Sequence, residues 1–212
     1  MIDPKTLRLY LCTDRALVKG RPLLEAVEAA ISGGVSLVQL REKDLCGRDF
    51  YLFAREMLTL TNRYNVPLII NDRLDIALAV GAAGVHLGQD DIPLAAARSL
   101  AGKDFIIGVS ARNPKDALMA EQDGADYLGT GAVFPTGTKA GAGVIGPQGL
   151  AAVLSAVKIP VVGIGGISSA NAAEVMAAGA NGIAVISAIL SQDDIHSAAA
   201  ELRAIVDSSA RG

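Results

Sequence analysis

The feature of this sequence that most constrains its fold is a junction that occurs four times, in which a helical stretch ends in glycine and a short strand-like run follows. Glycine adopts the left-handed conformation at a helix C-terminus at little cost, and the chain can then turn directly into a strand. Four such junctions predict repeated helix-to-strand units. The glycines are Gly33-Gly34, Gly81 to Gly84, Gly124 and Gly179, and the runs after them are 35–40, 85–87, 127–129 and 182–186.

A coarse interpretation of the whole chain extends this pattern to eight strands and eight helices. Several of the strands are apolar on both faces, as parallel strands covered by helices are. The expected strands are 7–13, 35–42, 67–72, 84–89, 105–110, 127–133, 160–165 and 182–187, and the helical patterns lie near 22–32, 48–64, 74–81, 93–101, 114–123, 147–157, 169–178 and 193–208. Eight units in a chain of 212 residues give about 26 residues per unit, the compact end of the range for a (β/α)8 barrel.

The sequence therefore predicts an α/β fold, with one single-domain (β/α)8 TIM barrel over residues 1–212. An open, doubly wound sheet is the alternative, but it usually contains fewer units. No linker or low-complexity stretch divides the chain. Hydrophobic residues make up 51% of the sequence, which is enough to form a large core.

Charge and cysteine content exclude several classes of protein and partner. The net charge is -3, and no run offers the clustered Lys and Arg that non-specific nucleic-acid binding requires. Cys12 and Cys46 form no CxxC or Cys/His cluster, which argues against a disulfide scaffold or a structural zinc site.

The sequence also shows no membrane or export signal. No stretch reaches the ~20 unbroken apolar residues of a membrane span, and the first residues lack the basic and then apolar pattern of a secretory signal. We therefore expect a cytoplasmic protein without membrane or nucleic-acid partners. A homo-oligomer is compatible with the sequence.

Polar residues cluster where the predicted strands end, as the active sites of barrels do. The second strand ends in Gln39-Leu40-Arg41-Glu42-Lys43. Because side chains alternate along a strand, Gln39, Arg41 and Lys43 share one face. Two cations and an amide together suit a multiply charged anion such as a diphosphate. The alternative is a solvated rim, in which Glu42 and Asp44 neutralise the cations.

Carboxylates follow the next two strands. The third strand ends at Asn71-Asp72, and the fourth leads to Asp90-Asp91. Oxygen ligands of this kind suit Mg²⁺, which commonly shares one or two carboxylates with a phosphate. Each Asp alone is better explained as a helix cap. Beside a cationic strand, a site for Mg²⁺ and a diphosphate explains the pattern better.

The remaining strand ends carry small and hydroxyl residues. Ser110 ends the fifth strand, and a loop with hydroxyls, a lysine and glycines follows the sixth. Loops after the seventh and eighth strands of barrels often bind phosphate through backbone N–H groups. The residues in question are 134–139, Gly165-Gly166, Ser168-Ser169 and Ile186-Ser187.

Two further patterns carry little functional information. The GxGxxG pattern at 141–146 has neither a strand leading directly into it nor an acidic residue about 20 positions later. His196 lies in the last helical stretch, and His86 lies in the fourth strand, either inside the barrel or between barrel and helix. The sequence contains no Ser/His/Asp or Cys/His arrangement that would indicate covalent catalysis.

Taken in order, these segments resemble the thiamine-phosphate synthase family, whose members are (β/α)8 barrel enzymes. The resemblance covers nearly the whole chain, and the ordered combination is far more specific than any one segment. The matching segments are 39–43, 71–72, 86–91, 108–110, 135–139, 163–167 and 185–187.

The resemblance implies a reaction and a set of residues. A pyrimidine diphosphate and a thiazole phosphate, or its carboxylated form, would give thiamine monophosphate and pyrophosphate with the help of Mg²⁺. Pyrophosphate would leave before the thiazole nitrogen attacks. The implied catalytic residues are Arg41, Lys43, Ser110 and Lys139, and the implied metal ligands are Asp72 and Asp91. The implied substrate-binding residues are Gln39, Leu40, Arg41, Glu42, Lys43, Asn71 and Lys139 for the pyrimidine diphosphate, Ser110 near the pyrimidine, and Thr136, Gly137, Thr138, Gly166, Ile186 and Ser187 for the thiazole phosphate.

Two alternatives remain open from the sequence. A thiazole tautomerase-like relative would share the fold but would need a positioned acid or base, for which His86 is the candidate inside the barrel. A sensor of phosphorylated ligands would bind both molecules and release no pyrophosphate. The segment after Lys139 is small and rich in glycine, whereas many relatives have bulkier polar residues there.

Overall fold

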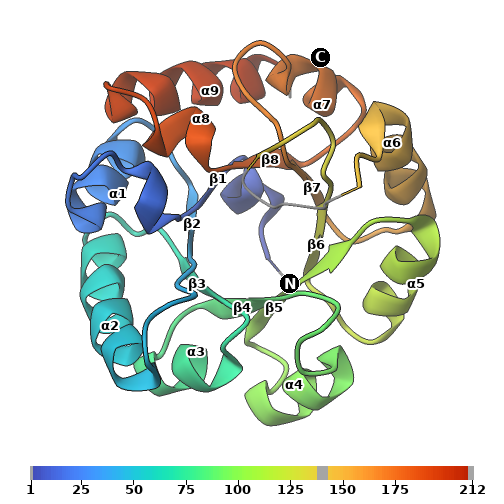
Figure 1. The fold of residues 1–212 in the computed structure, drawn as a ribbon. Coiled ribbons are helices and arrows are strands. Elements are labelled where there is room, and N and C mark those ends of the chain that lie inside the picture. Colours follow the sequence, from blue (N-terminus) through green and yellow to red (C-terminus); the bar gives the residue numbers. More distant parts are fainter. Residues whose placement is uncertain (1, 138–142, 210–212) are drawn as a thin grey trace.

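The computed structural model describes residues 2–137 and 143–209, which form a closed barrel of parallel strands surrounded by helices (Figure 1). Each strand pairs in parallel with the next, and β8 closes the barrel against β1. The predicted single-domain (β/α)8 barrel is confirmed, and the open doubly wound sheet is excluded. The strands are β1 (Leu9–Cys12), β2 (Leu37–Leu40), β3 (Leu68–Asn71), β4 (Gly84–Leu87), β5 (Ile106–Ala111), β6 (Tyr127–Thr130), β7 (Val161–Ile164) and β8 (Gly182–Val185).

Helices follow the strands and form the outer ring that Figure 1 shows around the barrel. They are α1 (Leu23–Ser32), α2 (Gly47–Arg63), α3 (Leu74–Val80), α4 (Leu94–Ala101), α5 (Pro114–Gln122), α6 (Gly146–Ala156), α7 (Ala172–Ala177), α8 (Ser187–Leu190) and α9 (Ile195–Ser209), with short 3-10 helices η1 (Pro4–Leu7) and η2 (Arg15–Leu17). Within the two described ranges, no helix combines the length and apolar character needed to cross a bilayer.

Each predicted strand differs from the observed one by one to three residues at one end or both, and for two strands the structure shows the cause. The first begins at Leu9 rather than at residue 7, because Pro4–Leu7 form η1, whose start is capped by the Asp3 side chain. The last was expected to reach residue 187, but it ends at Val185. Ile186 leaves the extended conformation, and its carbonyl accepts from the N–H of Leu190, which closes the short helix α8.

The alternation of side chains along the strands divides the core into two parts. Leu9 and Leu11 on β1 point outward into the large apolar layer between barrel and helices. Tyr10 and Cys12 on the same strand point into the barrel. A second, smaller core fills the barrel interior, and it consists of Ile2, Leu7, Tyr10, Cys12, Leu37, Ile69, Tyr127, Val162 and Ala184.

Glycine makes room for the largest side chain of the interior. Tyr127 is completely buried, and its ring lies against the backbone of Gly108 on the neighbouring strand β5. A Cβ atom built on Gly108 would lie 2.1 Å from Cζ of Tyr127. The ring therefore depends on the absence of a side chain at position 108.

Gly108→Ala should destabilise the fold by about 3 kcal/mol, because the added methyl group must displace a buried ring that has no free space around it. Gly143→Ala is the matched control, since a Cβ atom there meets nothing within 4 Å. Urea unfolding monitored by circular dichroism measures both. Equal stability of the two variants would contradict the packing described for Tyr127.

Candidate active site

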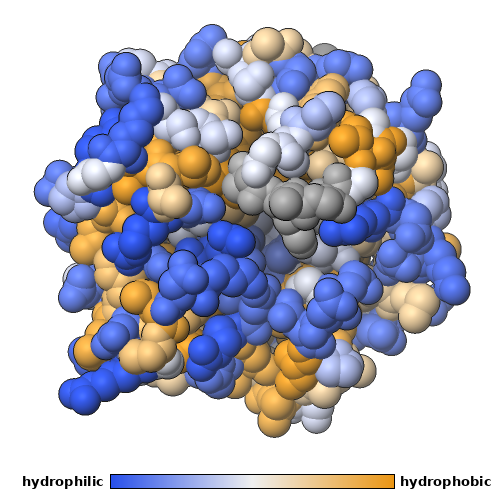
Figure 2. All heavy atoms as spheres, viewed as in Figure 1, coloured by the Kyte–Doolittle hydropathy of each residue, from blue (hydrophilic) through white to orange (hydrophobic). Residues whose placement is uncertain are grey.

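A cavity of about 240 Å³ opens where the carboxyl ends of the strands meet. Viewed along the barrel, Figure 2 shows hydrophilic residues gathered around the hollow in the middle of this face. Residues from all eight strands or the loops after them line the cavity. Among the residues expected to be functional, the cavity lining includes Gln39, Arg41, Lys43, Asn71, Asp72, Ser110, Thr136, Gly166, Ile186 and Ser187.

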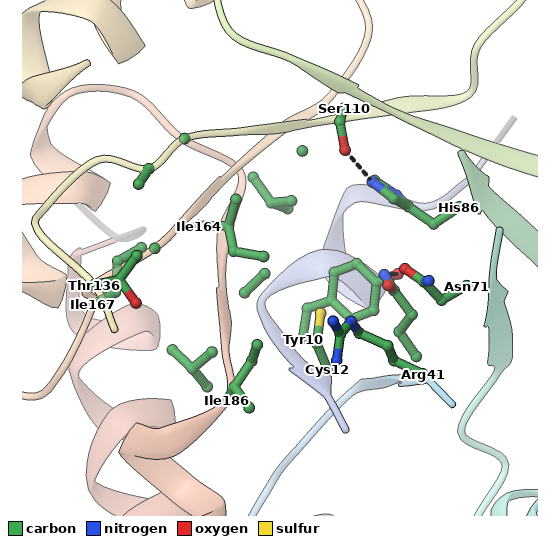
Figure 3. A pocket seen from close by; sticks show the side chains of 18 of the residues that line it. Tyr10, Cys12, Arg41, Asn71, His86, Ser110, Thr136, Ile164, Ile167 and Ile186 are labelled. Atoms are coloured by element: carbon green, nitrogen blue, oxygen red, sulfur yellow. Dashed lines mark hydrogen bonds between the residues drawn. The ribbon is translucent and has the colours of Figure 1, made fainter. Parts of the chain in front are cut away.

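The cavity has a polar side and an apolar side, which Figure 3 shows facing each other. Arg41, Asn71, His86 and Ser110 lie on the polar side. The apolar side is formed by isoleucines from the β7 and β8 ends, namely Ile164, Ile167 and Ile186, with Thr136 beside them. This arrangement suits a pair of ligands, or one ligand with a charged and an apolar part.

The strand β2 supplies the cationic part of the site by simple alternation. Gln39, Arg41 and Lys43 all line the cavity. Leu40, between them, is fully buried in the core outside the barrel. The side chain of Glu42 is only 5% exposed. Any contact of Leu40 or Glu42 with a ligand in the cavity would therefore involve their backbone.

The segment directly after β1, residues 13–15, fixes the cationic end of β2. The carboxylate of Glu42 binds the guanidinium of Arg15 at 2.8 Å. The backbone N–H of Arg41 donates to Oγ1 of Thr13 at 2.9 Å. The guanidinium of Arg41 lies 3.4 Å from Oδ2 of Asp14 and is partly exposed. Arg41 therefore has donors left for a ligand in the cavity.

The acidic part of the site comes from the ends of β3 and β4. Asp72 has a left-handed backbone with φ of 63°, a conformation that costs about 1 kcal/mol or more in a residue other than glycine. It directs the carboxylate toward the ammonium of Lys43, with which it forms a partly exposed ion pair. Asp72 also faces Asp91, and Oδ2 of Asp91 accepts from the N–H of Gly88 at 2.6 Å.

Burial and the neighbouring Asp72 raise the pKa of Asp91 above its ordinary value of 3.8, burial being the larger cause. The N–H of Gly88 and the ammonium of Lys43 oppose this increase. Two carboxylates that face each other in this way repel when both are ionised. A divalent cation between them would remove the repulsion.

The donor set at this edge fits Mg²⁺ if phosphate oxygens complete it. Mg²⁺ is usually held by one or two carboxylates together with water and substrate phosphates. Asp72 and Asp91 supply the carboxylates, and Arg41 and Lys43 would face the phosphates. Across residues 2–137 and 143–209, no group of three or more His, Cys, Asp or Glu forms a complete protein-only metal site. The metal-ligand role of the two aspartates stays a prediction.

A chain of buried hydrogen bonds runs beneath the cavity. Nε2 of Gln39 donates to Oη of Tyr10 at 2.6 Å, and the two phenol oxygens of Tyr10 and Tyr127 lie 2.8 Å apart. Nδ1 of His86 lies 3.0 Å from Oη of Tyr127, and Nε2 of His86 lies 3.0 Å from Oγ of Ser110. Figure 3 shows the last of these contacts. The sequence left the side of His86 open; the structure places it inside the barrel.

Burial keeps the phenols of Tyr10 and Tyr127 and the thiol of Cys12 in their neutral forms. It raises the pKa of both phenols, Tyr10 and Tyr127, far above neutrality. It also raises the pKa of the Cys12 thiol to about 12, although the charge of Arg41 lowers it. The cavity floor therefore offers neutral hydrogen-bonding groups, and the charged groups lie at the mouth.

Sequence reasoning missed several residues of the site and its floor, among them the wall residues Ile164 and Ile167. Tyr10, Cys12 and Arg112 line the cavity, and Tyr127 lies directly below it. The alternation of side chains along a strand was the available signal, because residues two apart share a face. Arg112 follows Ser110 by two residues, and Cys12 follows Tyr10 by two. This signal could not be applied to β1 without a polar residue to mark the inward face.

Three of the expected residues remain to be placed. Gly137 is described but does not line the cavity. Thr138 and Lys139 lie outside the described residues, so their expected contacts with the thiazole phosphate and the pyrimidine diphosphate stay predictions.

Comparisons with known proteins agree with this fold over almost the whole chain. Residues 9–189 match the family model described as thiamine monophosphate synthase. A thiamine-phosphate synthase from Clostridium novyi is 55% identical over 92% of this chain and 96% of its own. One from Ruminiclostridium cellulolyticum is 54% identical over 92% of each chain. The solved structure of a thiamine phosphate pyrophosphorylase from Pyrococcus furiosus superposes with a TM-score of 0.90 at 44% identity, over 97% of this chain and 98% of that one.

The fold and the site define a (β/α)8 barrel whose mouth combines cations, carboxylates and an apolar wall. The family match and the relatives identify the group of barrels concerned. The chain belongs to the thiamine monophosphate synthase family and is an enzyme of that kind, with a role in thiamine monophosphate synthesis.

The raised pKa of Asp91 predicts that this carboxylate costs stability when no metal is present. The folded protein holds the Asp91 proton more tightly than the unfolded chain does, so stability falls as the pH rises from 3.8 through the higher pKa of the folded state. Asp91→Asn removes this cost and should stabilise the metal-free protein at pH 7 by less than about 1 kcal/mol, because Asp91 is only partly buried and water screens the repulsion.

Urea unfolding in a chelator, at pH 7 and at pH 3, measures this gain, which should shrink at the lower pH as the wild-type carboxyl becomes protonated. A variant less stable than wild type at pH 7 would contradict the stated repulsion between Asp72 and Asp91.

Proposed function

We propose that this enzyme joins 4-amino-5-hydroxymethyl-2-methylpyrimidine diphosphate to a thiazole phosphate and releases pyrophosphate. The product is thiamine monophosphate. The observation that carries the proposal is the meeting of Arg41, Lys43, Asp72 and Ser110 at one cavity, in a chain that is 55% identical to a thiamine-phosphate synthase. The cations suit a diphosphate, and the neutral floor suits an aromatic ring.

The bond changes of the proposed reaction balance without an oxidant or reductant. The bond between the pyrimidine methylene carbon and the diphosphate oxygen breaks first, and its electron pair leaves with pyrophosphate. The lone pair of the thiazole nitrogen then forms the new carbon–nitrogen bond. If the thiazole carries a carboxylate, the carbon–carbon bond to it breaks, CO₂ leaves, and the electron pair that stays on the ring carbon takes a proton from water.

The cationic side chains stabilise the charge that develops on the leaving group. Arg41 offers a planar fork of donors, and Lys43 offers a point charge on the same face of β2. Fixed charges at the mouth of the barrel favour the separated pyrophosphate over the intact ester, because they need not reorganise as the bond breaks. By the family resemblance, Lys139 adds a third cation.

Asp72 and Asp91 would hold a Mg²⁺ ion at the same edge. When bound, this ion supplies further positive charge to the diphosphate oxygens. Lys43 contacts Asp72 directly, so the ammonium group and the metal would share this carboxylate. The aspartates thus arrange the cations around the leaving group.

The apolar side of the cavity suits the thiazole ring. Ile164, Ile167 and Ile186 form a wall without charge, which keeps water away from the methylene cation once pyrophosphate has separated. Gly166 and Ser187 lie next to this wall. Loops after the seventh and eighth strands bind phosphate in many barrels, and we assign the thiazole phosphate to this position. A cytoplasmic location, phosphorylated small molecules as the partners, and no nucleic-acid or membrane partner complete the proposal.

The purified protein, given both substrates and Mg²⁺, should release one pyrophosphate for each thiamine monophosphate formed. A chelator should stop both. Coupled pyrophosphate detection together with chromatography of the thiamine product makes the measurement. Binding without pyrophosphate release would indicate a sensor, and isomerisation of a thiazole carboxylate alone would indicate a tautomerase. Full turnover in the chelator would contradict the role of Mg²⁺.

Asp72→Asn should lower turnover at least about 100-fold while leaving the fold intact, because the amide keeps the size but loses the charge that binds the cations. Asp75→Asn is the matched control. Asp75 lies three residues away, is exposed, and pairs with Arg73 on the surface. Steady-state rates at saturating Mg²⁺ compare the two. Equal rates would remove Asp72 from the proposed metal site.

A further inference from the structure

The hydrogen bonds beneath the cavity form one continuous chain that ends at a ligand-facing hydroxyl. It runs from Gln39 through Tyr10, Tyr127 and His86 to Ser110, and each contact is between 2.6 and 3.0 Å long. Both phenols are completely buried. Ser110 lines the cavity. A change at the buried end of the chain can therefore alter the hydroxyl group that meets the ligand.

The amide nitrogen of Gln39, at one end of this series of hydrogen bonds, determines which group donates in each of the bonds that follow. The amide nitrogen of Gln39 can only donate, so Oη of Tyr10 accepts from it. The hydroxyl hydrogen of Tyr10 then has Oη of Tyr127 as its acceptor at 2.8 Å. If Tyr127 donated to Tyr10 instead, two donors would meet at one phenol oxygen. The buried hydrogen of Tyr10 would then lose this acceptor, which is costly.

The same order of donor and acceptor continues through the imidazole ring of His86 to Ser110. Tyr127 accepts from Tyr10 and donates its own hydrogen to Nδ1 of His86. An Nδ1 that accepts carries no hydrogen, so the neutral ring has its hydrogen on Nε2. Nε2 then donates to Oγ of Ser110. This assignment follows from satisfying each donor, in the way tautomers are inferred from hydrogen-bond networks.

We propose that His86 is a positioning residue that Tyr127 holds in the Nε2–H tautomer, so that the hydroxyl hydrogen of Ser110 points into the cavity. Ser110 is then a donor and selects a ligand atom that accepts, such as an aromatic ring nitrogen. The consequence for catalysis rests on the proposed function, in which the ligand beside Ser110 is a pyrimidine. The tautomer itself does not depend on that function.

The packing holds the imidazole ring in the orientation that this role requires. A Cβ atom on Gly129 of β6 would lie 3.0 Å from Cε1 of His86, so β6, two strands away from β4 in the barrel, leaves little free space beside the ring. The ring of Tyr127, on the same strand β6, has its centroid 5.6 Å from that of the imidazole. The backbone carbonyl of His86 also accepts from the N–H of Asp72. A ring confined in this way transmits a donor direction and does not rotate to a new partner.

Nitrogen-15 NMR of the histidine side chains tests the tautomer directly. The chain has only two histidines, and His196 is exposed on α9, so His196→Gln assigns both imidazoles. We expect the Nε2–H pattern for His86 at pH 7.5 and rapid tautomer averaging for His196. An Nδ1–H tautomer or an imidazolium at His86 would overturn the proposal, whatever reaction the enzyme catalyses.

Substitutions of the two phenols test whether the hydrogen bond that Tyr127 donates, and not the presence of a buried phenol alone, sets the tautomer of His86. Tyr127→Phe removes the group that donates to His86, so the Nε2–H preference should weaken and tautomer averaging should appear. Tyr10→Phe removes a phenol of the same size one step earlier, and Tyr127 still has His86 as its acceptor, so the pattern should persist. A Tyr127→Phe spectrum identical to wild type would overturn the role given to Tyr127, and the wild-type spectrum remains decisive if either variant fails to fold.

Ligand binding then tests the consequence for specificity. Tyr127→Phe should raise KM for the pyrimidine diphosphate about fivefold to tenfold, as expected for one weakened hydrogen bond. The Kd for inorganic pyrophosphate with Mg²⁺ should change less than twofold, because pyrophosphate lacks the ring. Equal weakening of both ligands would indicate general damage to the site and overturn the proposal. An enzyme with the expected tautomer but no thiamine phosphate synthesis would refute the proposed function and not the tautomer.

Discussion

The alternation of side chains along eight parallel strands is the constraint on which this structure depends. Each strand has only two residues, or sometimes three, that can point into the closed barrel. The first of these must fill the interior, as Tyr10, Leu37, Ile69 and Tyr127 do. The next reaches the cavity, as Gln39 and Asn71 do. The same alternation that packs the barrel therefore delivers polar groups from distant parts of the sequence to one place.

The site places its charges where they cost least and keeps its floor neutral. Arg41, Lys43 and Asp72 lie at the rim and are partly exposed, so water reduces the cost of holding them without a ligand. Below them, burial holds Tyr10, Tyr127 and Cys12 in their neutral forms. The unfavourable backbone of Asp72 and the raised pKa of Asp91 lie at the rim as well. Strain and repulsion are concentrated where a bound cation and anion would relieve them.

The sequence contained enough information for the barrel and for part of the cavity. Glycine at the helix ends and apolar runs after them indicated the repeated unit, and the period of two put Gln39, Arg41 and Lys43 on one face, where the structure has them. The hydrogen-bonded chain could not be found in this way, because it joins β1, β2, β4, β5 and β6 and depends on the register between them. His86 alternates with apolar residues on a strand buried on both faces, so its side could not be decided. The end of β8 was misjudged because Ser187 continues an apolar run yet begins α8.

A reaction that proceeds by departure of pyrophosphate needs charge and orientation more than it needs a base. The cavity has this character: its cations are at the rim, its apolar wall is opposite, and its histidine is bound through both ring nitrogens to hydroxyl groups. A histidine that removed a proton from a ligand would need one nitrogen facing that ligand. Here the ring of His86 lines the cavity, but Nδ1 contacts the hydroxyl of Tyr127 and Nε2 that of Ser110, so the imidazole acts on the ligand through the direction of a hydroxyl group. This is why the geometry favours a synthase over an isomerase on the same barrel.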